Sequence, residues 1–243
     1  MGKRRFSRHR LICKFAAEYS GMAKKKLERF QEIKAFPHVF EFNFQEISRG
    51  FALKGNWHSG FFKNNLPIVL ELGCGKGEYT VGLAQRSPEK NFIGVDLKGN
   101  RLWVGAKQIE TDSMSNAAFL RTRIDFIDYC FGPQEVSELW ITFPDPQPQK
   151  TRERKRLTSM RFLDRYRKFL KPDGIIHLKT DSKSFYDYTL EVIAENRYTL
   201  LDHTDDLYAN PEARPAELTE IKTHYEGIFS KKGFKICYLK FRF

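Results

Sequence analysis

The residue with the clearest chemical setting in this sequence is Asp145, which lies between Pro144 and Pro146 directly after the apolar run 139–143. Each proline fixes its own φ at about −65° and disfavours helix at the residue before it, so the carboxylate is predicted to sit on a stiff, irregular segment. A dense basic run, residues 150–156, follows at once. Together these features predict a polyanion site with one acidic residue inside it. The alternative is a proline-rich surface turn with a solvated charged face.

Three glycines, Gly73, Gly75 and Gly77, follow another apolar run, 68–72, and precede a predicted helix. Because glycine has no Cβ, such a turn lets the backbone approach a ligand closely. Asp96 ends the next apolar run about 20 residues later, the separation at which a carboxylate accepts hydrogen bonds from ribose hydroxyls. The combination predicts a nucleoside site, and a tight turn without a ligand is the alternative.

The charge around the glycine turn narrows the choice of nucleoside. The spacing is G-x-G-x-G and not the G-x-G-x-x-G of dinucleotide-binding folds, and Glu71 and Glu78 place negative charge on either side of the turn. A pyrophosphate needs an undisturbed helix N-terminus. A cationic or neutral nucleoside such as S-adenosylmethionine, with its amino group and sulfonium, suits these carboxylates better.

Two further acidic residues have two interpretations each. Asp125 opens a short predicted helix, and Asp181 ends a predicted strand just before another helix. Asp125 can accept a hydrogen bond from an adenine amino group, and Asp181 can contact the substrate. Either residue can instead cap the helix that follows it, and the sequence alone favours the cap at both positions.

The elements that must position these residues alternate between strand and helix from about Pro67. The pattern predicts strands at 68–72, 91–96, 117–121, 139–143, 174–181, 198–203 and 234–241, and helices at 78–86, 99–109, 125–131, 159–170, 182–196 and 220–229. Such alternation indicates an α/β fold with a mostly parallel seven-stranded sheet and helices on both faces. Ligands of such sheets bind beyond the carboxyl ends of the strands. The preceding segment, 36–63, is predicted to be irregular and packed over this sheet.

Length and charge bound the organisation of the chain. The 243 residues can bury one substantial core, and the formal net charge of +12 favours an acidic partner such as nucleic acid. Residues 1–34 carry many lysines and arginines and are predicted to form a basic N-terminal arm that is mobile or loosely helical; the alternative is an ordinary solvated extension. Residues 35–243 are predicted to form a single domain.

Several function classes are disfavoured by what the sequence lacks. No apolar run approaches the roughly 20 residues that span a bilayer, and Lys14 interrupts the apolar stretch where a signal-peptide core would lie. A cytoplasmic protein is therefore expected. The four cysteines form no C-x-x-C pair and the six histidines have no metal-ligand spacing, so we expect reduced thiols and no metal. No protein partner is implied, and a monomer and a homodimer both stay open.

Taken together, several motifs resemble one family. They are E-L-G-C-G-K-G-E at 71–78, G-V-D at 94–96, F-P-D-P at 143–146, K-R-L-T at 155–158, T-D at 180–181 and T-H-Y-E at 223–226. From about Lys24 to its end the chain resembles the bacterial single-chain tRNA (guanine-N7)-methyltransferases of the TrmB type. The resemblance implies a Rossmann-like S-adenosylmethionine-dependent methyltransferase fold for residues 35–243. It also implies methylation of guanine N7 at a variable-loop position in tRNA.

The resemblance implies roles for individual residues. Residues implied to line the S-adenosylmethionine pocket are Glu71, Gly73, Gly75, Asp96, Asp125 and Asp145, with Asp145 also closest to the chemistry. Residues implied to contact the target nucleotide are Asp181, Thr223, His224, Tyr225 and Glu226. The family usually has tryptophan where Gln147 stands and lysine where Gln149 stands, so the substrate-binding lysine is assigned to the nearest one, Lys150.

The implied chemistry is consistent with these residues. Guanine N7 carries an in-plane lone pair in the neutral base, so its methylation needs alignment and exclusion of water more than a strong base. A fixed carboxylate such as Asp145 can stabilise the positive charge that develops on the ring. Contacts to RNA phosphates are expected from residues 150–156, Arg165, Lys168, Lys231 and Lys232.

Three other functions share parts of this pattern. A nicotinamide-dependent oxidoreductase would share the fold and the acidic residue at 96, but the glycine spacing disfavours it. An RNA-binding protein that kept a methyltransferase fold without activity would share the basic surface. A methyltransferase acting on DNA or on protein is possible from the fold alone.

Overall fold

The structure is a computed structural model, and it describes residues 27–47 and 49–243. Most of the arm predicted for residues 1–34 therefore lies outside the described residues. Its last part, residues 27–32, is helical and continues into the turn η1 (Ile33–Ala35). Glu32 ties this helix to the following domain, because its carboxylate accepts hydrogen bonds from Trp103 Nε1 and Lys107 Nζ, each at 2.8 Å.

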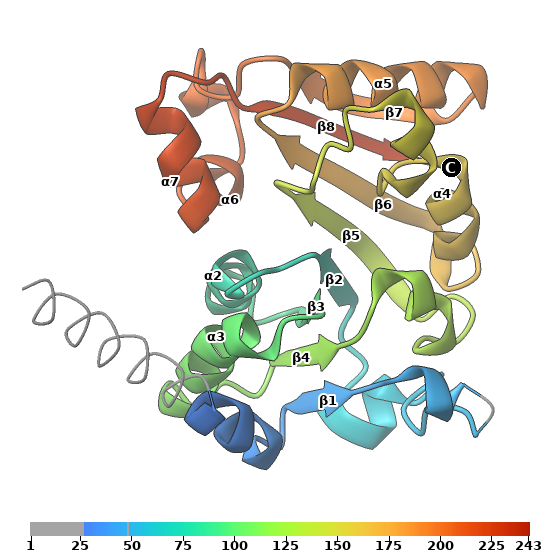
Figure 1. Ribbon diagram of the computed structural model, residues 1–243, viewed down its shortest axis with the longest axis vertical. Helices are drawn as coiled ribbons and strands as arrows, with labels where there is room; N and C mark the ends of the chain where they lie inside the picture. The colour runs from blue at the N-terminus through green and yellow to red at the C-terminus, as the bar shows by residue number, and fades with distance from the viewer. Residues whose placement is uncertain (1–26, 48) are drawn as a thin grey trace, which may run out of the picture.

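An eight-stranded sheet forms the centre of the molecule (Figure 1), in the order β1-β4-β3-β2-β5-β6-β8-β7. All neighbouring strands are parallel except β8, which is antiparallel to both β6 and β7. The strands are β1 (Val39–Glu41), β2 (Ile68–Leu72), β3 (Asn91–Asp96), β4 (Ala117–Arg121), β5 (Val136–Thr142), β6 (Leu170–Thr180), β7 (Thr199–Thr204) and β8 (Cys237–Arg242).

The prediction of a mostly parallel α/β sheet is confirmed, but the predicted number of seven strands is wrong. The additional strand is β1, in a segment predicted to be irregular. It has three residues and pairs with the outer edge of β4, with Val39 opposite Phe119. A run of three residues is too short to show an alternating pattern, so the sequence does not reveal it.

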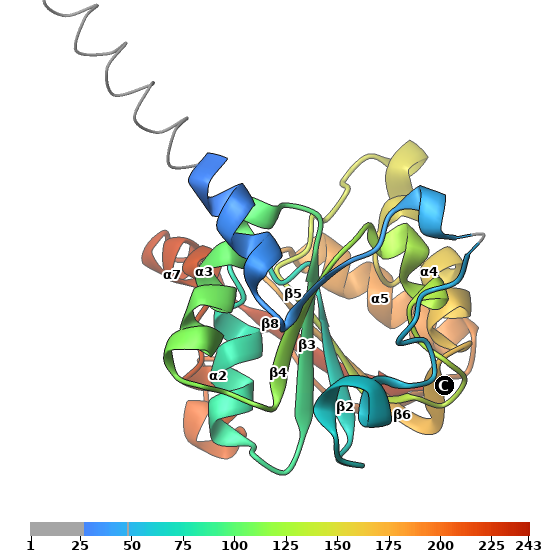
Figure 2. The ribbon, with the colours of Figure 1, turned by 90° about the horizontal axis from the view of Figure 1, so that it is seen from below.

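Helices cover both faces of the sheet (Figure 2). The α-helices are α2 (Glu78–Arg86), α3 (Gly99–Thr111), α4 (Met160–Tyr166), α5 (Lys183–Glu195), α6 (Ala216–Thr219) and α7 (His224–Lys231). Shorter turns of 3-10 or π type are η2 (Phe44–Glu46), η3 (Trp57–Phe62), η4 (Ile124–Tyr129), η5 (Lys150–Lys155) and η6 (Pro211–Ala213). On one face, α2, α3 and the α6 segment share a core with Val69. On the other face, α4, α5 and the side chains of Phe42, Trp57 and Phe62 pack in a core with Ile68 and Leu70.

Two predicted boundaries are wrong for physical reasons. The helix predicted at 159–170 ends earlier, at Tyr166, and β6 begins at Leu170, so the segment 172–174 belongs to this strand. The segment lies where the register between β5 and β6 shifts, from Val136 opposite Leu170 to Glu138 opposite Ile175, so the extra residues fit as an irregularity in the strand. The helix predicted at 220–229 begins later, at His224, because the Thr223 side chain caps α7 there, and the short helix α6 precedes the predicted range.

Candidate active site

The carboxyl ends of three adjacent parallel strands, β3, β2 and β5, bring the predicted site residues to one edge of the sheet. Gly73, Gly75 and Gly77 all have left-handed φ values, 79°, 60° and 77°. A Cβ added at Gly73 or Gly75 would meet no atom within 4 Å, whereas a Cβ at Gly77 would lie 2.3 Å from the Phe119 ring. The first two glycines therefore keep open space in front of the backbone, and the third serves the packing of α2.

The carboxylate of Asp96 is held by the backbone. Its Oδ2 accepts the Gly75 N–H at 3.0 Å, and its Oδ1 accepts the Lys98 N–H at 2.8 Å. Each oxygen retains a lone pair, and the side chain lines a cavity of about 610 Å³ between the glycine turn and the first turn of η4. A carboxylate fixed in this way is preorganised to accept hydrogen bonds from a diol.

Glu71 lies behind the glycine turn and lines neither of the cavities described here. Its side chain is buried, accepts hydrogen bonds from the Thr80 backbone N–H at 2.8 Å and the Thr142 hydroxyl at 2.5 Å, and also bonds to the Thr80 hydroxyl. Burial is the largest effect on this group and raises its pKa to about 7. The position of Glu71 therefore does not match the predicted direct contact with a ligand. Its hydrogen bonds instead connect β2 to α2 and β5.

Asp145 lies on the wall of the main cavity, whose volume is about 650 Å³. Its Oδ1 accepts the Gln147 N–H at 3.0 Å, and Arg156 Nε donates to the Pro146 carbonyl at 3.2 Å. Phe143 and Gln147 have left-handed φ values of 47° and 45°, a conformation that costs free energy for non-glycine residues. The segment that carries Asp145 is thus bent at both ends and fastened to the buried guanidinium of Arg156.

The first turn of α7 closes the other side of the main cavity, which Thr223, His224 and Tyr225 line. Thr223 caps the helix by accepting the Glu226 N–H at 3.1 Å, and the His224 N–H donates to Glu78 Oε2 at 3.0 Å. Glu226 does not reach the cavity. Its carboxylate lies in the interior, 2.8 Å from Lys179 Nζ, and accepts the Tyr208 hydroxyl at 2.5 Å.

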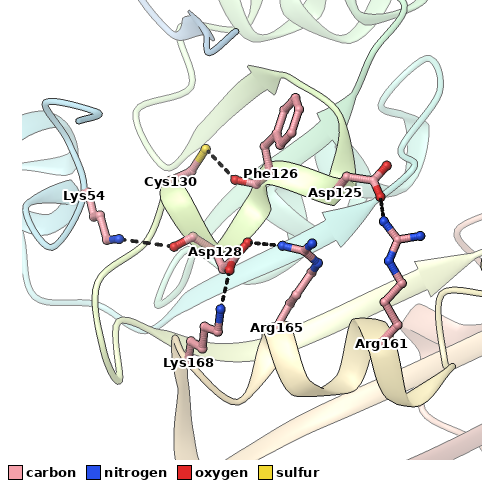
Figure 3. A network of polar contacts seen from close by, with 8 residues as sticks. All are labelled: Lys54, Asp125, Phe126, Asp128, Cys130, Arg161, Arg165 and Lys168. Carbon is pink, nitrogen blue, oxygen red and sulfur yellow. Dashed lines mark hydrogen bonds and ion pairs between the residues drawn. The ribbon is translucent and has the colours of Figure 1, made fainter. Parts of the chain in front are cut away.

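The two acidic residues with open interpretations are not helix caps. Asp125 forms ion pairs with Arg161 at 2.6 Å (Figure 3) and Arg123 at 3.4 Å, and lines the 610 Å³ cavity. Ser182 caps α5 in place of Asp181, because its hydroxyl accepts the Phe185 N–H. Asp181 instead lines the main cavity, where partial burial raises its pKa.

The basic run after β5 reaches the cavities through a different lysine from the one that the resemblance implies. Lys150 lies at the start of η5 and lines neither cavity, whereas Lys155, at the end of the same turn, lines both. Two other cations, Lys76 and Arg101, also line the main cavity. Lys76 lies inside the glycine motif, and Arg101 lies on the helix that follows Asp96. These positions next to predicted site residues are the features of the sequence that indicate the two cations.

Two of the cations predicted to bind phosphate have a partner within the protein. Figure 3 shows that Arg165 and Lys168 both point to the carboxylate of Asp128. The nitrogen–oxygen distance of each ion pair is 2.7 Å. Lys54, from the segment before β2, donates to the backbone carbonyl of the same aspartate at 3.3 Å. This cluster connects α4 and the segment before β2 to η4. Because Arg165 and Lys168 are already paired with Asp128, we expect them to contribute less to RNA binding than unpaired cations.

No group of three or more His, Cys, Asp or Glu side chains suited to a metal occurs in the part of the chain that the structure describes. Within the same residues, no helix is long and apolar enough to cross a membrane.

Comparison with known proteins identifies the family. Residues 65–239 match the profile of a family described as "Putative methyltransferase". The chain is 50% identical over 222 residues to a tRNA (guanine-N(7)-)-methyltransferase of Bacteroides thetaiotaomicron, an alignment that covers 91% of this chain and 86% of that protein. A tRNA (guanine-N(7)-)-methyltransferase of Clostridium novyi is 37% identical over 196 residues, covering 81% and 89%. The chain belongs to the tRNA (guanine-N(7)-)-methyltransferase family.

The fold agrees with this assignment. The 16S rRNA methyltransferase KamB superposes with a TM-score of 0.56 at 15% identity, over 83% of this chain and 94% of that one. At such low identity the likeness shows the fold alone, and it confirms the predicted methyltransferase fold. Membership of a tRNA (guanine-N(7)-)-methyltransferase family excludes the nicotinamide-dependent oxidoreductase considered from the sequence.

The residues predicted for this tRNA (guanine-N(7)-)-methyltransferase family member fall into three groups. Those that line the two cavities are Gly73, Gly75, Asp96, Asp125, Asp145, Asp181, Thr223, His224 and Tyr225. Glu71 and Glu226 are buried behind the cavity walls, and Lys150 lies outside both cavities.

Proposed function

We propose that this protein methylates guanine N7 in tRNA, with S-adenosylmethionine as the methyl donor. Membership of the tRNA (guanine-N(7)-)-methyltransferase family supports the reaction. The observation in the fold that carries the proposal is the position of Asp145, on the wall of a cavity that also reaches the glycine turn and the first turn of α7. A donor at the glycine turn and a base at α7 would meet beside this carboxylate.

The residues present fit S-adenosylmethionine. Asp96 has one free lone pair on each oxygen for the ribose hydroxyls, and Leu97 and Ile124 supply apolar contacts for adenine in the 610 Å³ cavity. Asp125, in the same cavity, can accept from the adenine amino group when Arg161 gives up part of its contact. The open backbone at Gly73 and Gly75 leaves room for the methionine portion. Both cavities have volumes typical of small-molecule sites.

When bound, S-adenosylmethionine supplies an electrophilic methyl group. Its transfer to N7 leaves the sulfur as a neutral thioether and places the positive charge on the methylated ring. The protein has to align guanine N7 with that methyl and exclude water from the approach. Asp145 lies where a carboxylate can stabilise the cationic product ring, and its hydrogen bond with the Gln147 N–H holds it in place. Thr223, His224 and Asp181 line the side of the cavity available to the base.

Binding of tRNA fits the charge of the protein. The net charge of +12 and the cations Lys76, Arg101 and Lys155 at the main cavity favour phosphate contacts, which weaken steeply as salt rises. A target in the variable loop, as the family resemblance implies, would present unpaired nucleotides that can enter a cavity. Such a substrate fits a cytoplasmic protein acting as a monomer or a homodimer.

The test is methyl transfer from labelled S-adenosylmethionine to unmodified tRNA, followed by mass spectrometry of the digested nucleosides. We expect 7-methylguanosine at one position. Label on another atom would contradict the assigned target, and binding of S-adenosylhomocysteine without any transfer would favour the RNA-binding alternative. Asp145→Ala serves as the matched variant, expected to bind S-adenosylhomocysteine but to transfer far less methyl.

A further inference from the structure

A row of aromatic rings leads from the main cavity to the surface at α7. Phe143, Tyr225 and Phe229 line the cavity. The Phe229 ring lies 6.3 Å from Phe143 and 6.4 Å from Tyr225, with interplanar angles of 24° and 22°. Phe234 continues the row outside the cavity, edge-on to Phe229 at 6.0 Å. Its side chain is 53% exposed.

The position of Phe234 is fixed by the way α7 ends. The Gly233 N–H donates to the Ser230 carbonyl at 3.0 Å, the Phe234 N–H donates to the Phe229 carbonyl at 3.1 Å, and Gly233 has a left-handed φ of 78°. These are the two hydrogen bonds and the glycine of a Schellman motif. The motif favours an apolar residue at 234 that contacts residue 229, but it requires neither a ring nor an exposed face.

The start of α7 is also anchored, so the whole row is held relative to the cofactor side of the cavity. Thr223 caps the helix, the His224 N–H is bonded to Glu78 next to the glycine turn, and Glu226 is paired with Lys179 in the interior. Rings held at both ends of a helix lose little conformational entropy when a ligand stacks on them.

The surroundings of Phe234 are cationic. Lys231, Lys232 and Lys235 are all exposed and lie within three residues of it. Lys235 shares its charge with Asp206 at 3.3 Å. A ring beside exposed ammonium groups suits a nucleotide, because the base can stack on the ring while the phosphate contacts a lysine.

We propose that Phe234 and Phe229 form a stacking subsite for the unpaired nucleotide next to the guanine in the main cavity. The inference rests on the proposed function and specifies how that site holds its RNA. The neighbouring base occupies the exposed face of Phe234, outside the cavity, and its phosphate lies near Lys231 or Lys232. The subsite thus keeps the RNA strand extended while the guanine enters the cavity.

The test compares steady-state kinetics with unmodified tRNA for the wild type, Phe234→Leu, Phe234→Tyr and Phe44→Leu. Leucine keeps the apolar contact of the Schellman motif but removes the ring, and tyrosine keeps the ring. Phe44 is 71% exposed and lies outside the main cavity, so it is the matched control. We expect Phe234→Leu to raise the KM for tRNA about tenfold, with unchanged S-adenosylhomocysteine affinity and unchanged salt dependence, while the other two variants resemble the wild type.

An unchanged KM in Phe234→Leu, or an equal rise in Phe234→Tyr or Phe44→Leu, would overturn the subsite. A second measurement uses the wild type alone, with 2-aminopurine placed in turn on each side of the target guanine. Stacking on Phe234 predicts quenched fluorescence at one of the two positions when the RNA binds, and no quenching at either position would also overturn the inference. If the wild type forms no 7-methylguanosine at all, the proposed function fails instead.

Discussion

The ammonium of Lys179 lies 2.8 Å from the carboxylate of Glu226, and neither side chain is exposed to solvent. Lys179 also donates to the Leu218 carbonyl at 2.6 Å, and its nitrogen lies 5.3 Å from the centre of the Tyr79 ring. Burial lowers the pKa of Lys179, an effect that the charge of Glu226 opposes. This pair joins β6 to α7, so it holds the helix whose first turn closes one side of the main cavity.

Removing one partner of this pair is expected to destabilise the protein strongly. Lys179→Met leaves the Glu226 carboxylate buried without its cation, which costs about 3–5 kcal/mol of unfolding free energy. Lys179→Met/Glu226→Met removes both charges and should recover much of that loss. Urea denaturation of the wild type, the single variant and the double variant measures the unfolding free energy of each. A double variant no more stable than the single one would show that the two charges are not coupled.

The charge of Asp145 is expected to matter for turnover and not for folding. Asp145→Asn retains an oxygen that can accept the Gln147 N–H, so the local turn survives. We expect kcat to fall about 100-fold, the scale seen when a group that stabilises developing charge is lost, with S-adenosylhomocysteine affinity within a few-fold of the wild type. Full turnover in this variant would mean that the negative charge has no electrostatic role.

Asp96→Asn is expected to weaken cofactor binding. Both carboxylate oxygens accept a backbone N–H, so an amide must turn its NH2 group towards one of these donors. We expect the Kd for S-adenosylhomocysteine to rise at least tenfold, or about 1.4 kcal/mol, in isothermal titration calorimetry. Asp112→Asn, on the exposed end of α3, is the control and should bind like the wild type.

Burial of Glu71 is expected to make the unfolding free energy of the protein depend on pH. The pKa of Glu71 in the folded protein is raised from 4.5 to about 7, so the folded state binds the proton more tightly than the unfolded chain. This contribution is fully present below pH 4.5 and is lost as the pH rises to about 7, a change on the order of 3 kcal/mol. The unfolding free energy of Glu71→Gln should lack that change. Denaturation of both proteins between these pH values tests it, and parallel curves would contradict it.

The basic surface should divide into cations that contact RNA and cations that do not. Lys155 lines both cavities, whereas Lys168 is paired with Asp128. Lys155→Ala is expected to reduce the slope of log K for tRNA against log salt by about one. Lys168→Ala should change that slope less. Filter binding over a range of salt concentrations measures both, and equal reductions would contradict the assignment of Lys168 to the fold.

The strands at the centre of the sheet could be predicted from the sequence, and the burial of individual acidic residues could not. Residues 68–72, 91–96 and 117–121 are apolar runs bounded by polar or turn residues, and β2, β3 and β4 match them. Parallel pairing then brings Gly75, Asp96 and Asp145 to one edge. The sequence around Glu71 and Glu226 does not show that their carboxylates are paired in the interior, because the partners Thr142 and Lys179 are distant in sequence.

The same limit applies to residues on short turns. Lys150 and Lys155 belong to one basic run, and only the direction of η5 decides which of them reaches the cavities. The cap of α5 also differs from the prediction by one residue. The hydroxyl of Ser182, and not the carboxylate of Asp181, lies where it can accept the Phe185 N–H. The division into a basic arm and one domain stays a prediction.

The antiparallel pairing of β8 with β6 determines where the last residues lie. Cys237 is opposite Thr180 and Arg242 is opposite Ile175, so β8 runs antiparallel to β6 (Figure 1). It therefore runs away from the carboxyl edge of β6, the edge at which the cavities lie. Phe243 packs edge-on against Tyr198 at 5.3 Å, at the far end of the sheet. A purification tag or a sensor-chip tether joined after Phe243 would therefore leave the tRNA-facing edge free, which makes C-terminal immobilisation the preferred geometry for binding assays.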